Sequence, residues 1–245
     1  MFLIGGWVAN DNEWDRFSTE WTIVLQTPPA IRYFSHHESK AAGGQFEGWT
    51  PQQIEAKAIA LTEVICHRDV YGIISGLNLQ THASAFKNSV LPKKQLQSAL
   101  RLVHPYQWCF FSVIAAVLQA QLDRGGFQDT VDFVFDQQKG LFKKCAEFYR
   151  EFKSHMPAEK RAIAGTVGEA SDREVPALQA ADLLVGQVTT NLRVGKPELP
   201  WRRMAIALKI MSVKAYPPGF ENLPDLVSQL NVIWSTKRLA DIDTH

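Results

Sequence analysis

The chain has 245 residues, which is long for one domain but still within the range of a single α/β domain. Its composition, 46% hydrophobic and 21% charged, is that of an ordinary globular protein. A formal net charge of +1 excludes a bulk polycation, so any contact with nucleic acid must come from a local basic patch. Three widely spaced cysteines without a CxxC motif disfavour a zinc site and a disulfide framework, and indicate buried free thiols.

The predicted elements alternate between strands and helices along most of the chain. Hydrophobic periodicity and end signals place them, in chain order, at residues 2–9 (strand), 11–25 (helix), 31–34 (short extended segment), 51–67 (helix), 70–79 (strand), 105–122 (helix), 131–136 (strand), 140–155 (helix), 162–167 (strand) and 176–193 (helix), with short tail helices at 201–213 and 225–234. The clearest start signal precedes the second of these helices, where Thr50 is the N-cap, Pro51 the first helical position and Gln53 the capping-box residue.

This alternation predicts one α/β domain in which a mixed sheet is covered by helices. We expect the domain to span residues 1–196, and residues 197–245 to form a helical extension packed on it. The chain contains no GxGxxG, P-loop, HExxH or GxSxG motif. The N-terminal apolar run is too short for a signal peptide, and no apolar stretch reaches the roughly 18 residues of a membrane span. We therefore expect a cytoplasmic protein with no membrane partner.

Two aspartates lie where apolar residues are expected. Asp136 ends an apolar strand pattern, and Asp182 lies on a predicted core-facing helix stripe with Leu178, Val185 and Leu192. A carboxylate that faces a core is costly unless a cation, a metal or several donors satisfy it. The pattern therefore predicts a divalent-metal site shared by the two aspartates.

Each aspartate also has a purely structural interpretation. A strand-end aspartate such as Asp136 can cap the following turn, and a helix aspartate can pair with the N-terminal dipole. Asp182 lies six residues after Pro176, the predicted first helical position, which is beyond the turn where capping acts. The structural interpretation is therefore more plausible for Asp136 than for Asp182.

Four segments, taken in order, carry a family resemblance. They are Phe2–Val8 with Trp14 and Trp21 after it, Tyr33–Glu38, Val134–Gln138 and Leu178–Gly186. Together they resemble the domain-of-unknown-function family 3800, a bacterial and phage group in the ribonuclease H-like superfamily. The resemblance spans about residues 2 to 195, and its last segment is the most specific. It implies a ribonuclease H-like mixed sheet flanked by helices, shortened at the N-terminus and followed by a helical C-terminal tail.

The resemblance also implies a catalytic site made of carboxylates. Asp136 matches the family position at the end of the fourth strand, Asp182 the position on the last helix, and Glu38 a further acidic position. With His36 nearby, these residues would bind Mg²⁺ or Mn²⁺, which prefer oxygen ligands. Ribonuclease H-like enzymes cleave phosphodiesters with two such ions, so the resemblance implies a metal-dependent nuclease.

The chain departs from the family pattern at its first strand. The family carries an Asp-Glu-Ser-Gly segment there, and this sequence contains no such segment. Either the chain is shortened or it is a naturally degenerate member. Residues 2–9 would then form the family's second strand, and its exposed edge would favour a homodimer. The absent aspartate leaves a second function open, an inactive binding or scaffold module in phage defence or mobile-element biology.

Nucleic-acid contacts have candidate residues but no motif. Trp201, Arg202 and Arg203 place aromatic and basic groups together near the tail, and Lys139 closely follows Asp136. A solvated basic surface is the alternative interpretation of these residues.

Overall fold

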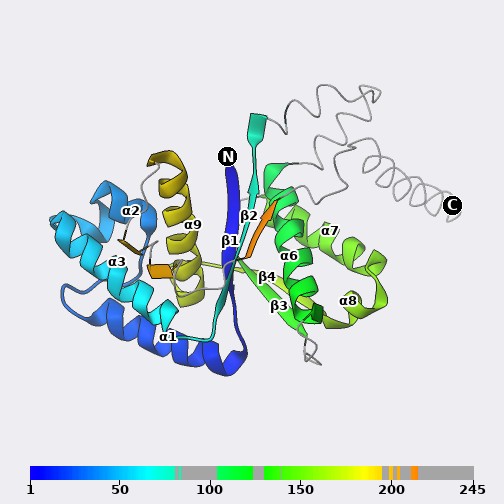
Figure 1. The fold of residues 1–245 in the computed structure, drawn as a ribbon, viewed down its shortest axis with the longest axis horizontal. Coiled ribbons are helices and arrows are strands. Elements are labelled where there is room, and N and C mark those ends of the chain that lie inside the picture. The colour runs from blue at the N-terminus through cyan, green and yellow to red at the C-terminus, as the bar shows by residue number, and fades with distance from the viewer. Residues whose placement is uncertain are drawn as a thin grey trace, which may run out of the picture.

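The computed structural model describes residues 1–80, 83, 104–123, 130–138, 140–194, 199–200, 203–204 and 211–214. In chain order its elements are β1 (Phe2–Val8), α1 (Asp11–Gln26), α2 (His36–Ala41), the 3-10 helix η1 (Gly44–Phe46), α3 (Pro51–Cys66), β2 (Tyr71–Leu77), α6 (Pro105–Asp123), β3 (Val131–Asp136), α7 (Phe142–His155), α8 (Ala158–Ile163), β4 (Ala164–Ala170), α9 (Pro176–Val194) and β5 (Met211–Lys214) (Figure 1). This mixture of strands and helices confirms the predicted α/β class.

The strands form two sheets in the described part of the chain. β1 pairs antiparallel with β2, from Phe2 opposite Leu77 to Val8 opposite Tyr71, and β2 pairs in parallel with β5. β3 and β4 form a separate parallel pair. The prediction of one mixed sheet is therefore wrong for these residues. The prediction fails because strand pairing depends on contacts between distant segments, which local periodicity does not encode.

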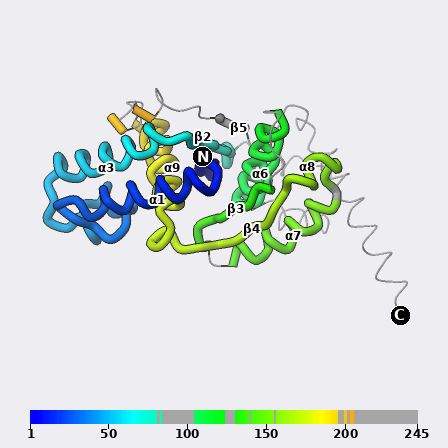
Figure 2. The backbone as a smooth tube through the Cα atoms, turned by 90° about the horizontal axis from the view of Figure 1, so that it is seen from below, coloured from blue at the N-terminus to red at the C-terminus, as the bar shows by residue number. Residues whose placement is uncertain are grey.

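The helices form two groups, which both views separate (Figures 1 and 2). In one group α9 packs against β1 and contacts α1, α2 and α3. In the other α6 packs against β1 and β2 and contacts α7 and α8. Each group encloses its own hydrophobic core. Phe17 and Trp21 of α1 meet Leu183 of α9 in the first core, and Phe110 of α6 meets Phe133 of β3 in the second.

β1 supplies side chains to both cores in alternation, as successive residues of a strand point to opposite faces. Leu3 and Trp7 pack into the core on the α9 side. Phe2, Ile4 and Val8 pack into the core on the α6 side, which also contains residues of β3 and β4. β1 therefore joins the two halves of the described structure.

The contact between β1 and α9 is unusually close. A Cβ atom at Gly5 would lie 2.9 Å from Cγ2 of Val185 and 3.1 Å from the carbonyl oxygen of Ile73, so only glycine fits there. The Trp7 indole N–H then donates to the Ala180 carbonyl of α9 at 3.0 Å. Together these contacts fix the position of the helix that carries the candidate site.

Local signals predict several helix ends correctly. α3 has the complete capping box, in which the Gln53 N–H donates to Thr50 Oγ1 at 3.3 Å and the Thr50 N–H donates to Gln53 Oε1 at 2.8 Å. Residues 31–34 form no strand and lead into α2, whose N-cap is Ser35. The sequence does not predict α8, which displaces the start of the following strand to Ala164.

Two predicted burial patterns are wrong. β3 is expected to be buried, but Phe133 is its only buried residue and Val134 is 55% exposed. The predicted core stripe of α9 ends at Leu192, which is 57% exposed. The buried face of α9 instead includes Gln179 and Gln187, polar residues that a hydrophobicity pattern does not assign to a core.

The described part of the C-terminal tail differs from the predicted structure. Met211–Lys214 is extended and pairs in parallel with β2, which contradicts a helix that continues to residue 213. Most of that segment, and all of the predicted helix at 225–234, lie outside the described residues. The boundary after residue 196 stays a prediction. Within the described ranges, no helix has both the length and the apolarity to cross a membrane.

All three cysteines carry free thiols, as predicted. Cys109 and Cys145 are buried, whereas Cys66 is half-buried. Burial raises the pKa of the Cys109 thiol to about 11 and that of the Cys145 thiol to about 12. Both thiols therefore stay protonated and unreactive at neutral pH.

Candidate functional site

One face of α9 holds the chain segment that leads into α2. Gln179 Oε1 accepts the Phe34 backbone N–H at 3.1 Å, and Asp182 Oδ2 accepts the His36 backbone N–H at 2.7 Å. Gly186, one turn further along, lies against the His36 ring, where any side chain would clash. The three α9 residues follow the i, i+3, i+7 spacing of one helix face. Their spacing therefore explains why this face can hold the segment.

Asp182 is half-buried, and its surroundings disfavour its charge. Burial raises the pKa of the Asp182 carboxyl above its ordinary value, and the charges of Asp172 and Asp136 raise it further. The His36 N–H and the nearby His37 lower the pKa but do not reverse the shift. A cation placed beside the carboxylate would relieve this unfavourable interaction.

Asp136 and Asp172 meet at the ends of two parallel strands. β3 ends at Asp136, and Asp172 lies two residues after Ala170, the last residue of β4. The Asp172 backbone N–H donates to Asp136 Oδ1 at 3.3 Å. Burial raises the pKa of the Asp172 carboxyl, and the charge of Asp136 raises it further. The carboxyl ends of neighbouring parallel strands are a common location for ligand sites in α/β folds.

Asp172 is absent from the predicted site. The predicted strand before it ends at Val167, because Gly168 interrupts the apolar pattern, and Asp172 then resembles a loop residue. Pairing with β3 extends β4 to Ala170, which makes Asp172 a strand-end carboxylate like Asp136. The sequence does not predict the position of Asp172, because the end of β4 depends on its register with β3, which no local pattern encodes.

Glu38 is held by groups of its own loop. Its Oε1 accepts the Tyr33 hydroxyl at 2.8 Å, and its Oε2 accepts the Gln45 backbone N–H at 3.2 Å. Gly44 lies directly against the Glu38 side chain with a φ of 58°, a conformation that favours glycine. The Glu38 charge is the smallest of the influences that raise the pKa of Asp172. Glu38 therefore acts only weakly on the Asp172 carboxyl, and its hydrogen bonds give it a structural role in its own loop.

Asp136, Asp172 and Asp182 form what we call the carboxylate set. In the described ranges, no three or more His, Cys, Asp or Glu side chains are arranged to hold a metal ion. The predicted ligand His36 contributes its backbone N–H, and its ring lies against Gly186. Mg²⁺ is commonly bound by one or two carboxylates, with water and substrate phosphate in the other positions. The all-oxygen carboxylate set fits Mg²⁺ or Mn²⁺ in donor chemistry, without forming an all-protein cage.

The predicted nucleic-acid residues are only partly described. Trp201, Arg202 and Lys139 lie outside the described residues. The Arg203 guanidinium forms an ion pair with Glu63 of α3. This ion pair gives Arg203 a structural role at the surface of α3.

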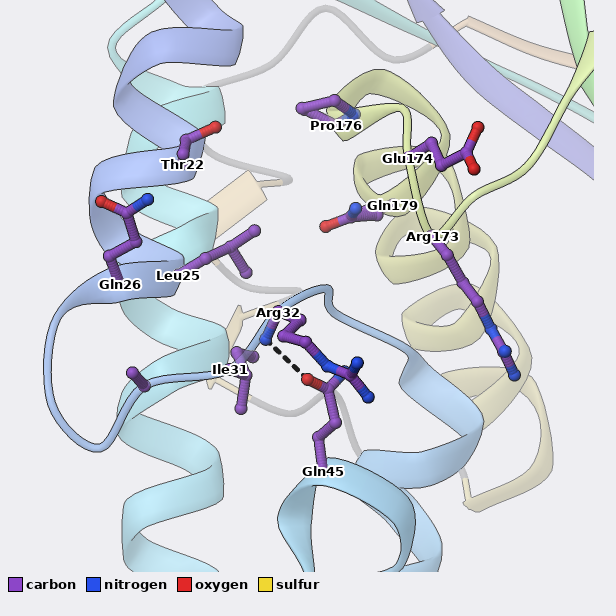
Figure 3. A pocket seen from close by; sticks show the side chains of 11 residues that line it. Thr22, Leu25, Gln26, Ile31, Arg32, Gln45, Arg173, Glu174, Pro176 and Gln179 are labelled. Carbon is purple, nitrogen blue, oxygen red and sulfur yellow. Dashed lines mark hydrogen bonds between the residues drawn. The ribbon is translucent and has the colours of Figure 1, made fainter.

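A cavity of about 750 Å³ lies between α1, the segment that follows it and the start of α9 (Figure 3). Its polar lining includes Thr22, Gln26, Arg32, Gln45, Arg173 and Gln179. The cavity adjoins the carboxylate set, because Arg173 follows Asp172 in the chain and Gln179 lies one turn before Asp182 on α9. The sequence does not predict this cavity, since its walls come from segments more than a hundred residues apart.

Comparisons with protein-family models, with curated proteins and with solved structures give no match for this chain. The resemblance to the ribonuclease H-like superfamily stays a prediction, and a functional assignment rests on the geometry of the carboxylate set and of the cavity beside it.

Proposed function

We propose that this chain is a divalent-metal-dependent phosphodiesterase of the ribonuclease H-like superfamily that acts on nucleic acid. The observation that carries the proposal is that carboxyl groups lie at the ends of β3 and β4 and on α9, where the Asp172 N–H donates to Asp136 and the charges of Asp136 and Asp172 raise the pKa of Asp182. Carboxyl groups whose pKa values are raised by burial and by like charges are concentrated at functional sites.

The charge of the set explains why the proposed activity needs a cation. A phosphodiester is an anion, and the three carboxylates would repel it unless positive charge lay between them. Bound Mg²⁺ or Mn²⁺ would supply a Lewis acid that activates water and stabilises the leaving oxygen. One or two of the carboxylates of Asp136, Asp172 and Asp182 would hold the ion, with water and a substrate phosphate in its other positions. The His36 N–H orients the Asp182 carboxylate, and the Asp172 N–H orients that of Asp136.

Thermal unfolding of chelator-treated protein with added Mn²⁺ or Mg²⁺ tests the metal site. The ion should raise the Tm, because a ligand that binds only the folded chain stabilises it by mass action. The increase should shrink in Asp182→Asn, which keeps the side-chain shape and an oxygen for the His36 N–H. Asp15→Asn, at an exposed position of α1, is the matched control and should keep the full increase. A Tm that does not change across millimolar Mn²⁺ contradicts the proposal.

Cleavage of labelled DNA and RNA, each single- and double-stranded, tests the activity and identifies the substrate. We expect cleavage that depends on the metal and falls by about a hundredfold or more in Asp136→Asn, since a metal-holding carboxylate contributes several kcal/mol to transition-state stabilisation. Asp15→Asn should cleave at the unchanged rate. Metal-independent cleavage, or equal rates in both variants, would point to a contaminating nuclease.

The second candidate is a binding or scaffold module without catalysis. The observation that favours it is that Asp182 and Glu38 accept backbone N–H groups and so hold neighbouring segments in place. A purely structural Asp182 predicts that Asp182→Ala lowers the Tm equally with and without metal, whereas Asp182→Asn leaves the Tm unchanged in both conditions. A loss of the metal-dependent increase in Asp182→Asn excludes this candidate.

A further inference from the structure

The cavity beside the carboxylate set contains one polar group that the fold orients but does not use. Gln179 is 2% exposed, and its Oε1 accepts the Trp21 indole N–H at 2.8 Å and the Phe34 backbone N–H at 3.1 Å. Because both partners are donors, the amide oxygen must face them and the amide nitrogen must face away. Among the described residues, Gln179 Nε2 has no hydrogen-bond partner, and the side chain lines the cavity (Figure 3).

Gln179 Nε2 opens on the cavity as a donor with a fixed orientation, so a ligand in the cavity can supply its acceptor. The opposite wall supplies the complementary group. Thr22 of α1 lines the cavity and donates its hydroxyl hydrogen to the Ser18 carbonyl at 2.7 Å, so its oxygen stays available only as an acceptor. Figure 3 shows Thr22 and Gln179 on facing helices across the cavity. The two walls therefore present an acceptor and a donor to the same space.

Gln45, by contrast, is occupied by the fold. Its Oε1 accepts the Arg32 backbone N–H at 2.6 Å, and its Nε2 donates to the Tyr33 carbonyl at 2.9 Å (Figure 3). Gln45 thus fixes the loop that carries Arg32. These bonds hold the loop, so the backbone of Arg32, which lines the cavity, is fixed in position.

The lining of the cavity carries more positive than negative charge. Arg32 and Arg173 line it against the single carboxylate of Glu174. The Arg173 guanidinium lies 5.2 Å from the centre of the Tyr33 ring. The Arg32 guanidinium is exposed and makes no hydrogen bond or ion pair within the described part of the chain. A planar guanidinium of this kind matches the geometry of a phosphate group.

We infer that this cavity binds a nucleoside monophosphate unit, with the base between α1 and α9 and the phosphate at Arg32. The Gln179 N–H and the Thr22 oxygen match a base edge that carries an acceptor and a donor. Leu25 and Pro176 supply apolar surface for the faces of the ring. The volume of about 750 Å³ lies within the range of small-molecule sites, about 300–1,000 Å³.

This inference rests on the proposed function and deepens it. The bound unit would lie next to the carboxylate set, so the adjoining phosphodiester would reach the position where cleavage is proposed. The cavity would then bind the nucleotide unit that provides affinity, and the carboxylate set would lie at the phosphodiester that is cleaved.

Calorimetric titration of the chelator-treated protein with AMP, GMP, CMP and UMP tests the cavity apart from any cleavage. We expect at least one of them to bind. Inorganic phosphate and the corresponding nucleoside, which each offer half of the contacts, should bind about tenfold or more weakly. An absence of binding by all four nucleotides at millimolar concentration overturns the inference, as does equal binding of inorganic phosphate alone.

Variants of the two walls test the individual contacts. Arg32→Gln should weaken nucleotide binding about tenfold. Its matched control, Arg193→Gln, removes an exposed arginine from the last turn of α9 and should leave the affinity unchanged. Gln179→Glu keeps an acceptor for the Trp21 and Phe34 N–H groups and replaces the amide donor in the cavity with a carboxyl oxygen, so nucleotide and nucleoside should both bind more weakly. Unchanged affinity in Arg32→Gln, whose side chain is exposed and not needed for folding, overturns the inference.

The same chemistry occurs in a free nucleotide and in a unit of a nucleic-acid strand. Titration with a short oligonucleotide separates these sources, since tighter binding than the mononucleotide identifies a strand and weaker binding identifies the free nucleotide. Either result supports the cavity as the site. Nucleotide binding without metal-dependent cleavage supports this inference and contradicts the proposed activity. Metal-dependent cleavage without nucleotide binding supports the proposed activity and contradicts this inference.

Discussion

The fold acts in opposite directions on the charges of two aspartates, Asp172 and Asp132. The pKa of Asp172 is raised, first by burial and then by the charge of Asp136. The pKa of Asp132 is lowered, first by the Thr166 hydroxyl and then by the Thr166 backbone N–H, which donate to Asp132 Oδ1 at 2.7 and 2.6 Å. Folding therefore opposes the ionised form of Asp172 and favours that of Asp132, which gives the two residues opposite effects on stability as the pH changes.

The first prediction concerns the pH dependence of these two residues. A raised pKa contributes stability that is present below the unfolded-state pKa and is lost as the pH rises through the folded-state pKa. Asp172→Asn should therefore raise the Tm by about 1–2 °C at neutral pH in the presence of chelator, and the gain should vanish in acid. Asp132→Asn should lower the Tm at neutral pH, because its stabilisation is present above the unfolded-state pKa and is lost as the pH falls through the folded-state pKa. Thermal melts across the acidic range check both signs, and responses of the same sign contradict the assignment.

The second prediction concerns the indole of Trp21. This side chain is fully buried, stacks on Phe17 with ring centres 5.3 Å apart and donates to Gln179 at 2.8 Å. Trp21→Phe should lower the free energy of unfolding by about 2–4 kcal/mol, since it leaves a void and a missing donor in one core. Trp14→Phe is the control, because Trp14 is half-buried and packs edge-on against Phe17, and it should cost about 1 kcal/mol or less. Urea titration measures both, and equal losses would show that the hydrogen bond to Gln179 contributes little.

Among the elements, β1 and α9 depend most on each other. Gly5 and Gly6 are neighbours in β1, but a Cβ at Gly5 would meet Val185 and the Ile73 carbonyl, whereas a Cβ at Gly6 would meet nothing within 4 Å. Gly5→Ala should therefore destabilise the fold by about 1–3 kcal/mol through separation of β1 and α9. Gly6→Ala should be neutral or stabilise by about 0.4–1 kcal/mol. Chemical denaturation measures the difference, and equal effects would mean that the two elements can move apart without cost.

The sequence predicts elements wherever the determinants are local. The capping box from Thr50 to Gln53 and the apolar pattern of residues 2–9 each lie within one element. The capping box is found as predicted, and the strand is found with its end one residue earlier, at Val8. Gln179 is buried because Trp21 and Phe34 satisfy it from more than a hundred residues away, so no local pattern indicates its place in the core. The candidate site also has local and long-range determinants. The strand-end position of Asp136 follows from a local pattern, whereas its proximity to Asp172 follows from the pairing of two strands.

At the scale of the whole molecule, β1 has both faces covered and, within the described residues, one edge paired. α9 and α6 contact its two faces, and β2 pairs along its full length. In the described part of the chain, no strand pairs with its other edge. Backbone N–H and C=O groups on such an edge bind a further strand readily. A second copy of the chain offers an identical edge, and two copies of β1 can pair antiparallel about a twofold axis.

We therefore expect a homodimer that forms through β1 and whose population rises with protein concentration in sedimentation velocity. Gly6→Lys places a charge beside the pairing edge at a position where a Cβ meets nothing within 4 Å, so it should shift the equilibrium toward the monomer. Gly168→Lys makes the same change in β4, where a Cβ also meets nothing within 4 Å, and should leave the dimer intact. If the unmodified chain is monomeric at every concentration, or if both lysine variants dissociate equally, the edge of β1 is not the interface. A dimer lost only in Gly6→Lys assigns the interface to β1, because the two substitutions change the charge identically and differ only in the strand that carries them.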